Sequence, residues 1–139
     1  MHNPSMEERF PKDLHSLDAV FSFLQRFLDA HPVDPAAAFS ITLAVEEFFT
    51  NIIKYGGTKA GLISIIASLN GRQLRVELVD PDSDPFDPTQ RDAPTGDLSL
   101  DERPIGGLGI HLSREMLDDV RYEYAGRRGT ITLVKNLES

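Results

Sequence analysis

Apolar residues recur at helical spacing in two stretches of the first part of the chain. In "LDAVFSFLQRFLDAH", residues 17–31, they fall on one side of a helix that Ser16 caps and Pro32 ends. Asp34 and the proline after it predict the start of a second helix, which runs to about Tyr55, where two glycines end it. The pattern therefore predicts two helices before any strand.

Two hairpins follow in the pattern. The runs "GLISIIASL" and "QLRVELV" flank "NGR", and Asn70-Gly71 is typical of a two-residue hairpin turn. "VRYEYA" and "TITLVKN", joined across "GRRG", predict a closing hairpin, and "LGIHLSREMLDD" before it predicts a third helix. Helices and hairpins in this order predict an α+β fold. We expect a two-layer α/β sandwich with helices on one face of a mixed, mostly antiparallel sheet.

Composition narrows the function classes. A chain of 139 residues with 40% hydrophobic residues suits one domain with a packed core. The net charge of −8 argues against a broad nucleic-acid surface, and the lack of cysteine excludes thiolate metal sites and Cys nucleophiles. We find no apolar signal core and no run long enough to span a membrane, so we expect a soluble, cytoplasmic protein.

The second helix carries a polar margin beside its apolar face. Glu47 and Asn51 are four residues apart and share one side, whereas Glu46 lies on the opposite flank. An acid and an amide at the rim of a buried face stand where a pocket between helix and sheet would open. The alternative is a solvated polar edge.

A glycine-rich turn precedes the predicted third helix. Gly106, Gly107 and Gly109 in "RPIGGLGIHL" would let backbone N–H groups approach phosphates at a helix N-terminus. Neither the Rossmann fingerprint nor a Walker A sequence is present. The alternative is an ordinary junction between a loop and a helix that needs positive φ.

The stretch "LVDPDSDPFDP" places four acids and three prolines directly after an apolar run. Asp80, Asp82 and Asp84 imitate the start of a calcium-binding EF-hand, but Pro85 replaces its turn glycine and Arg91 stands at its twelfth position. A disordered linker is also a poor fit, because structured elements on both sides must pack together. The remaining interpretation is a turn at the end of a core strand whose first aspartate points into a pocket.

Together these motifs resemble the histidine-kinase-type ATPase family over about residues 10–136, and most of all its small anti-sigma-factor serine kinases. "EEFFTNIIKY" is similar to the family's N box, which implies that Glu47 is the general base and that Asn51 holds Mg²⁺. "VDPDSDPFDP" is similar to the box whose aspartate accepts a hydrogen bond from adenine, which implies Asp80. Asp82 stands at the position of that box's glycine and is the alternative residue for the hydrogen bond with adenine.

The most specific resemblance is that of "RPIGGLGIHLSREMLDDVRYEY" to the family's phosphate-side glycine box and the following helix. It implies that Gly106, Gly107, Leu108 and Gly109 lie at the phosphates of ATP. "GTITLVK" resembles the closing strands and implies that Thr130 lies near the adenine.

The resemblance implies a single ATP-binding domain, residues 1–139, with a lid at about 89–105. It implies a Mg-ATP-dependent anti-sigma regulatory factor with protein serine kinase activity toward a STAS-type anti-anti-sigma partner. A sigma factor is the second implied partner, and a homodimer is expected, with no direct contact to nucleic acid or membrane. Two alternatives stay open: an ATP-binding, partner-switching module without phosphotransfer, and an ATPase with water as acceptor.

Overall fold

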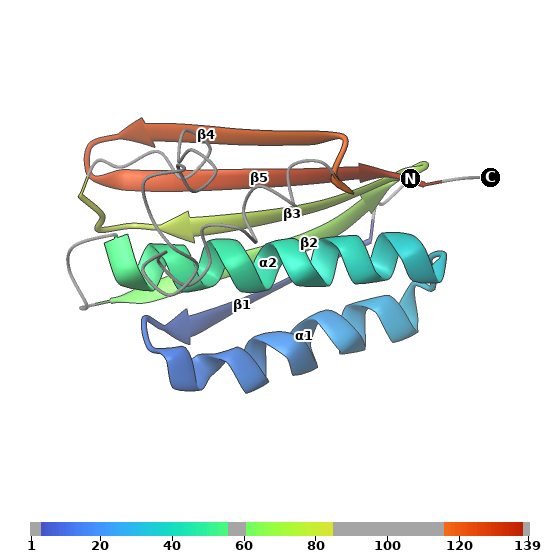
Figure 1. Ribbon diagram of the computed structural model, residues 1–139, viewed down its shortest axis with the longest axis horizontal. Coiled ribbons are helices and arrows are strands. Elements are labelled where there is room, and N and C mark those ends of the chain that lie inside the picture. The colour runs from blue at the N-terminus through green and yellow to red at the C-terminus, as the bar shows by residue number, and fades with distance from the viewer. Residues whose placement is uncertain (1–3, 56–60, 85–115, 138–139) are drawn as a thin grey trace, which may run out of the picture.

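Five strands form one antiparallel sheet, and two long helices cover one of its faces, within residues 4–55, 61–84 and 116–137, which the computed structural model describes (Figure 1). The strands are β1 (Ser5–Pro11), β2 (Leu62–Asn70), β3 (Gln73–Asp80), β4 (Asp119–Ala125) and β5 (Arg128–Asn136). The helices are the short 3₁₀ turn η1 (Leu14–Ser16), α1 (Leu17–Ala30) and α2 (Pro35–Tyr55). The spatial order of the strands is β1-β2-β3-β5-β4. The predicted α+β fold class is confirmed.

Both predicted helices begin where the sequence indicates, although one of the two caps differs. Asp34 caps α2 as expected, because its Oδ2 accepts a hydrogen bond of 3.0 Å from the Ala37 amide. Ser16 precedes α1 but caps no amide with its side chain. Its hydroxyl instead donates to the Pro11 carbonyl at 2.8 Å and so ties the helix start to the end of β1.

The first hairpin turn lies one residue later than predicted. Asn70 pairs with Gln73 in the sheet, so the two turn residues are Gly71 and Arg72. Gly71 has a φ of +62°, which the first central position of a type II′ turn requires. The predicted closing hairpin is confirmed, with Gly126 and Arg127 as its turn.

One face of the sheet and both helices enclose a single apolar core. Side chains of β2, β3 and β5 alternate between buried and less buried positions, as expected where one face is covered. The core members from α2 lie on one side of that helix: Ile41, Ala44, Val45, Phe48, Phe49 and Ile52. By length and composition α2 could also cross a membrane, but half of its apolar window is buried inside this domain. It has the properties of a core helix.

Two predicted features differ from the structure or lie beyond its described part. The edge strand β1 was not predicted, because Phe10 is its only buried residue and alternation is therefore weak. The predicted third helix falls mostly on residues outside the described ranges. Of its last residues, Met116 is helical and Asp119 is already the first residue of β4.

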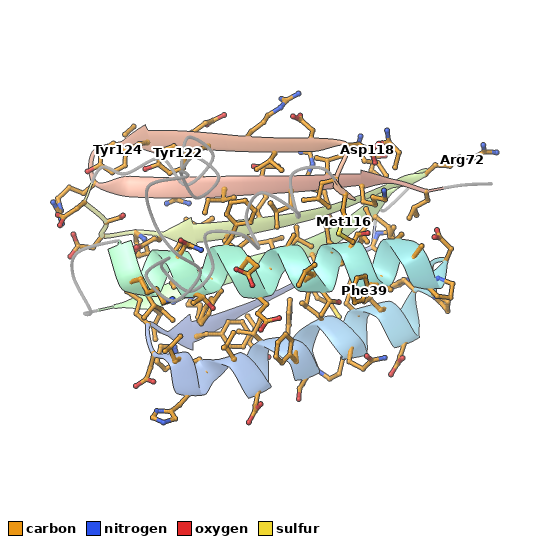
Figure 2. The ribbon with its side chains drawn as sticks, in the orientation of Figure 1. Phe39, Arg72, Met116, Asp118, Tyr122 and Tyr124 are labelled. Carbon is orange, nitrogen blue, oxygen red and sulfur yellow. The ribbon has the colours of Figure 1, made fainter. Side chains whose placement is uncertain are left out.

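Phe10→Ala tests whether β1 belongs to the fold. Phe10 is 2% exposed and meets the Phe23 ring edge-on, with centroids 5.8 Å apart. We expect a loss of about 3–5 kcal/mol in the free energy of unfolding, measured by urea titration. The matched control is Phe39→Ala, since Phe39 is 62% exposed on α2 (Figure 2) and its truncation should change stability by less than about 0.5 kcal/mol. Equal losses in the two variants would contradict this packing.

Candidate functional site

The polar residues singled out in the sequence gather at one end of the two layers. The C-terminal ends of α2, β1, β3 and β4 and the start of β5 all lie at the left end of the view (Figure 1). Antiparallel pairing places the turn between β4 and β5 beside the end of β3, since Asp80 pairs with Gly129. Side chains from distant parts of the sequence therefore meet there.

Asn51 presents a buried acceptor atom without a partner. The residue has no exposed surface, and its Nδ2 donates to the Glu47 carbonyl one turn earlier at 2.6 Å. That bond fixes which end of the amide is which, because only the nitrogen can donate. The Oδ1 atom has no hydrogen-bond partner. A buried, unpaired acceptor of this kind requires an explanation.

Glu47 carries a second unsatisfied oxygen on the same side of α2. Its Oε2 atom is buried without a hydrogen-bond partner. Burial raises the pKa of the Glu47 carboxyl above its ordinary value; the charge of Glu46 raises this pKa further, and that of Lys54 lowers it. A carboxylate with a raised pKa is a stronger base than an exposed glutamate.

The unpaired amide oxygen of Asn51 suits a hard cation. Mg²⁺ prefers oxygen ligands, keeps several waters, and takes only one or two ligands from the protein when phosphates supply others. The unpaired Oδ1 of Asn51 is therefore the donor that would hold it. Within the described residues, no group of three or more His, Cys, Asp or Glu side chains could hold a metal on its own. A cation held at Asn51 would need further oxygen ligands from water or from a bound anion.

Asp80 ends β3 as a buried, charged residue on the helix-covered side of the sheet. It is 2% exposed, and Lys12 Nζ lies 2.8 Å from its Oδ2. The Asp82 amide donates to its Oδ1 at 3.1 Å. Burial raises the pKa of the Asp80 carboxyl, although the hydrogen bond and the charge of Lys12 act in the opposite direction.

Asp82 lies in a different environment from Asp80. Its side chain is half exposed, and its Oδ1 accepts from Arg127 Nε at 2.7 Å. Asp84 Oδ1 lies 3.2 Å from Nη2 of the same arginine. Asp80, at the end of β3, thus pairs with Lys12, whereas Asp82 and Asp84 in the loop pair with Arg127.

Arg127 braces the loop after β3 against the closing hairpin, a role that the sequence did not reveal. It has a φ of 65°, the only positive φ among the described residues other than glycine. Its carbonyl accepts from the Ser83 amide at 2.7 Å, and the Ser83 carbonyl accepts from the Tyr124 hydroxyl at 2.9 Å. Figure 2 shows Tyr124 and Tyr122 at this end of β4. The only available signal was an arginine inside a predicted turn.

Thr130 and Asp80 lie on opposite faces of the sheet. It pairs with Val79 and lies on the open face of the sheet, where it lines a shallow polar hollow with Glu77, Thr132 and other residues. Side chains alternate along a strand, so a difference of one position moves a residue to the other face. Gly129 is the β5 residue on the side of Asp80, and a Cβ there would lie 3.5 Å from the Tyr122 hydroxyl.

The remaining predictions concern residues outside the described ranges. They are the phosphate-side turn, Gly106, Gly107, Leu108 and Gly109, and the lid at about 89–105. Both stay predictions.

The chain matches the histidine kinase-like ATPase domain over residues 10–135, nearly its whole length. It belongs to this family. Membership implies that the domain binds ATP. No curated protein matches the chain.

Solved structures share this fold at low sequence identity. The RsbU and RsbW domains of Rv1364c from Mycobacterium tuberculosis give a TM-score of 0.69 at 17% identity, covering 96% of this chain and 32% of that one. This chain therefore spans about a third of that protein chain. The SiaB–SiaC complex from Pseudomonas aeruginosa gives 0.64 at 14% identity, covering 93% and 88%. The histidine kinase AdeS of Acinetobacter baumannii gives 0.53 at 14% identity, covering 96% and 68%.

Glu47→Gln tests the electrostatic cost of this ATPase-domain site. A carboxyl whose pKa is raised by folding favours the folded state below its unfolded pKa, and loses that contribution as the pH rises through the folded value. The ionised form thus destabilises the fold at neutral pH. We expect the variant to melt at a higher temperature than the wild type at pH 8, and the difference to vanish below pH 4.5, the ordinary value. A gain that is independent of pH would contradict the assignment.

Proposed function

We propose that this protein is a Mg-ATP-dependent serine kinase that phosphorylates a STAS-type anti-anti-sigma protein and also binds a sigma factor. The observation that carries the proposal is the pair of unpaired oxygens on one side of α2, Asn51 Oδ1 and Glu47 Oε2. A metal donor and a base one turn apart are what transfer from ATP to a hydroxyl needs.

Asn51 holds Mg²⁺ through Oδ1 in this proposal. The ion supplies charge neutralisation for the phosphates, which a chain of net charge −8 cannot provide broadly. The hydrogen bond from Nδ2 to the Glu47 carbonyl keeps the amide turned so that its oxygen stays available. Gly106, Gly107, Leu108 and Gly109 remain the predicted contacts to the phosphates.

Glu47 acts as the general base. The partner's serine oxygen forms a bond to the γ-phosphorus of ATP, the bond from that phosphorus to the bridging oxygen breaks, and ADP leaves with the electron pair. The serine proton passes to Glu47, whose carboxylate has a buried oxygen free to take it. Such a base typically contributes a factor of about 10²–10⁴ to the rate.

Asp80 rather than Asp82 accepts the hydrogen bond from the adenine amino group in this proposal. Asp80 is buried at the end of β3, whereas Asp82 is half exposed and bound to Arg127. A buried acceptor discriminates between bases more strongly than an exposed one, because a wrong base leaves it unpaired.

The partner classes rest on the sequence resemblance and on the kinds of protein that share the fold. One neighbour includes an RsbW domain beside an RsbU domain, and another was solved as a complex of SiaB with SiaC. We infer a similar partnership here, between a cytoplasmic homodimer of this chain, a sigma factor and a STAS-type protein.

A second candidate is an ATP-binding module that switches partners without phosphotransfer. It is favoured by Asp82, which stands where the family has a glycine, and by Asp80, whose carboxylate already pairs with Lys12. Both features bear on the affinity for the nucleotide rather than on the general base Glu47.

Transfer of radiolabel from ATP to a STAS-domain protein encoded beside this gene tests the proposal. We expect labelled partner with the wild type, about 10²–10⁴-fold slower labelling with Glu47→Gln, and unchanged ATP affinity in that variant by calorimetry. Glu46→Gln is the matched control, because it changes the same charge on the other flank of α2 and should keep labelling within a few fold.

The other outcomes separate the alternatives. ATP binding with no label on the partner would contradict the kinase and leave the binding module. Release of phosphate without any partner would indicate an ATPase. Absence of ATP binding would contradict both the kinase and the module.

A further inference from the structure

Lys12 is the charged side chain that the proposed function leaves unexplained. Its side chain is 1% exposed, and isolated buried ammonium groups are costly unless they are paired. The ammonium lies 2.8 Å from Asp80 Oδ2 and donates to the Asp82 carbonyl at 2.7 Å. It therefore joins the end of β1 to the last residue of β3 and to the loop that follows.

The backbone that carries Lys12 is itself fixed. The preceding Pro11 carbonyl accepts hydrogen bonds from the Ser16 hydroxyl and from the Asp13 amide, both at 2.8 Å. Pro11 pairs with Leu62 in the sheet. The ammonium thus reaches Asp80 from a rigid point, which is the arrangement expected of a group that positions another.

We propose that Lys12 holds Asp80 as a fixed hydrogen-bond acceptor and thereby makes the site select adenine over guanine. This inference rests on the proposed function, in that it takes Asp80 as the residue that meets the base. It concerns a residue that touches Asp80, so Lys12 is a positioning residue.

The geometry leaves Asp80 able to accept one more hydrogen bond. A carboxylate has about four acceptor sites. The Asp82 amide takes one on Oδ1, and Lys12 lies against Oδ2, so the orientation is fixed at both oxygens while capacity remains. The purines differ where such an acceptor would meet them, because adenine carries an amino donor and guanine a carbonyl acceptor. A carboxylate accepts from the first and repels the second.

Lys12 also decides whether Asp80 stays charged. The groups around Asp80 are Lys12 after β1, Asp82 in the following loop with its partner Arg127 from the β4–β5 turn, and Tyr122 from β4 near Gly129. Burial and the charge of Asp82 raise the pKa of Asp80, whereas Lys12 lowers it by both hydrogen bond and charge. Removing Lys12 would therefore let Asp80 take up a proton at a higher pH. A protonated carboxyl has an O–H donor, so it could donate a hydrogen bond to the guanine carbonyl.

Lys12→Met in the full chain tests this, with ATP and GTP affinities measured by calorimetry in Mg²⁺ between pH 6 and pH 9. We expect the wild type to prefer ATP at every pH. We expect the ATP-to-GTP affinity ratio of the variant to fall by about ten- to a hundredfold at pH 6 and to recover as the pH rises. Lys135→Met is the matched control, because Lys135 bonds the Met116 carbonyl near the other end of β5 and should leave the ratio unchanged.

If the ATP-to-GTP affinity ratio of Lys12→Met stays at the wild-type value from pH 6 to pH 9, this inference is overturned but the proposed function is not. If neither nucleotide binds to the wild type, the proposed function and this inference are overturned together.

If Lys12→Met does not fold, the double variant Lys12→Met/Asp80→Asn replaces it, since removing both members of a buried ion pair is tolerated better than removing one. An amide at position 80 can both donate and accept. The double variant should therefore bind ATP and GTP about equally at every pH, and retention of the wild-type preference would overturn the inference.

Discussion

A buried acceptor without a hydrogen bond costs a folded protein about 1–3 kcal/mol, and Asn51 Oδ1 is such an atom. An apolar side chain at this fully buried position would avoid the cost. The unsatisfied oxygen is instead oriented by a hydrogen bond from its own nitrogen to the Glu47 carbonyl. In our account, the bound cation supplies the partner that the protein lacks, and the stability lost in the free protein is recovered as binding.

The same helix supplies both the rigidity and the chemistry of the site. Phe48, Phe49 and Ile52 pack in the core between α2 and the sheet. The polar residues Glu47 and Asn51 lie on the adjacent side of the helix. Across the site, Lys12 and Arg127 hold the end of β3 and its loop from two directions. Groups held in this way by packing and by a second set of contacts keep their geometry when a ligand arrives. In our account, precision at the site thus comes from side chains other than the proposed ligands themselves.

Sequence reasoning succeeded where local pattern determines the structure. The start of α2 followed from Asp34 and its proline, and the shared side of Glu47 and Asn51 followed from helical geometry. It failed where tertiary pairing decides. β1 buries only Phe10, so its pattern is weak, and the contact of Lys12 with Asp80 joins residues far apart in the chain. The register also places Thr130 on the open face of the sheet, opposite to Asp80, and its implied place near the adenine stays a prediction.

The central claim is that the amide oxygen of Asn51 is the protein's ligand for a nucleotide-bound cation. A crystal structure with Mg²⁺ and a non-hydrolysable ATP analogue tests it most directly. We predict the ion at about 2.0–2.1 Å from Asn51 Oδ1, with phosphate oxygens and waters completing its octahedron. An ion bound to the phosphates through other side chains, with Oδ1 still unpaired, would contradict the account.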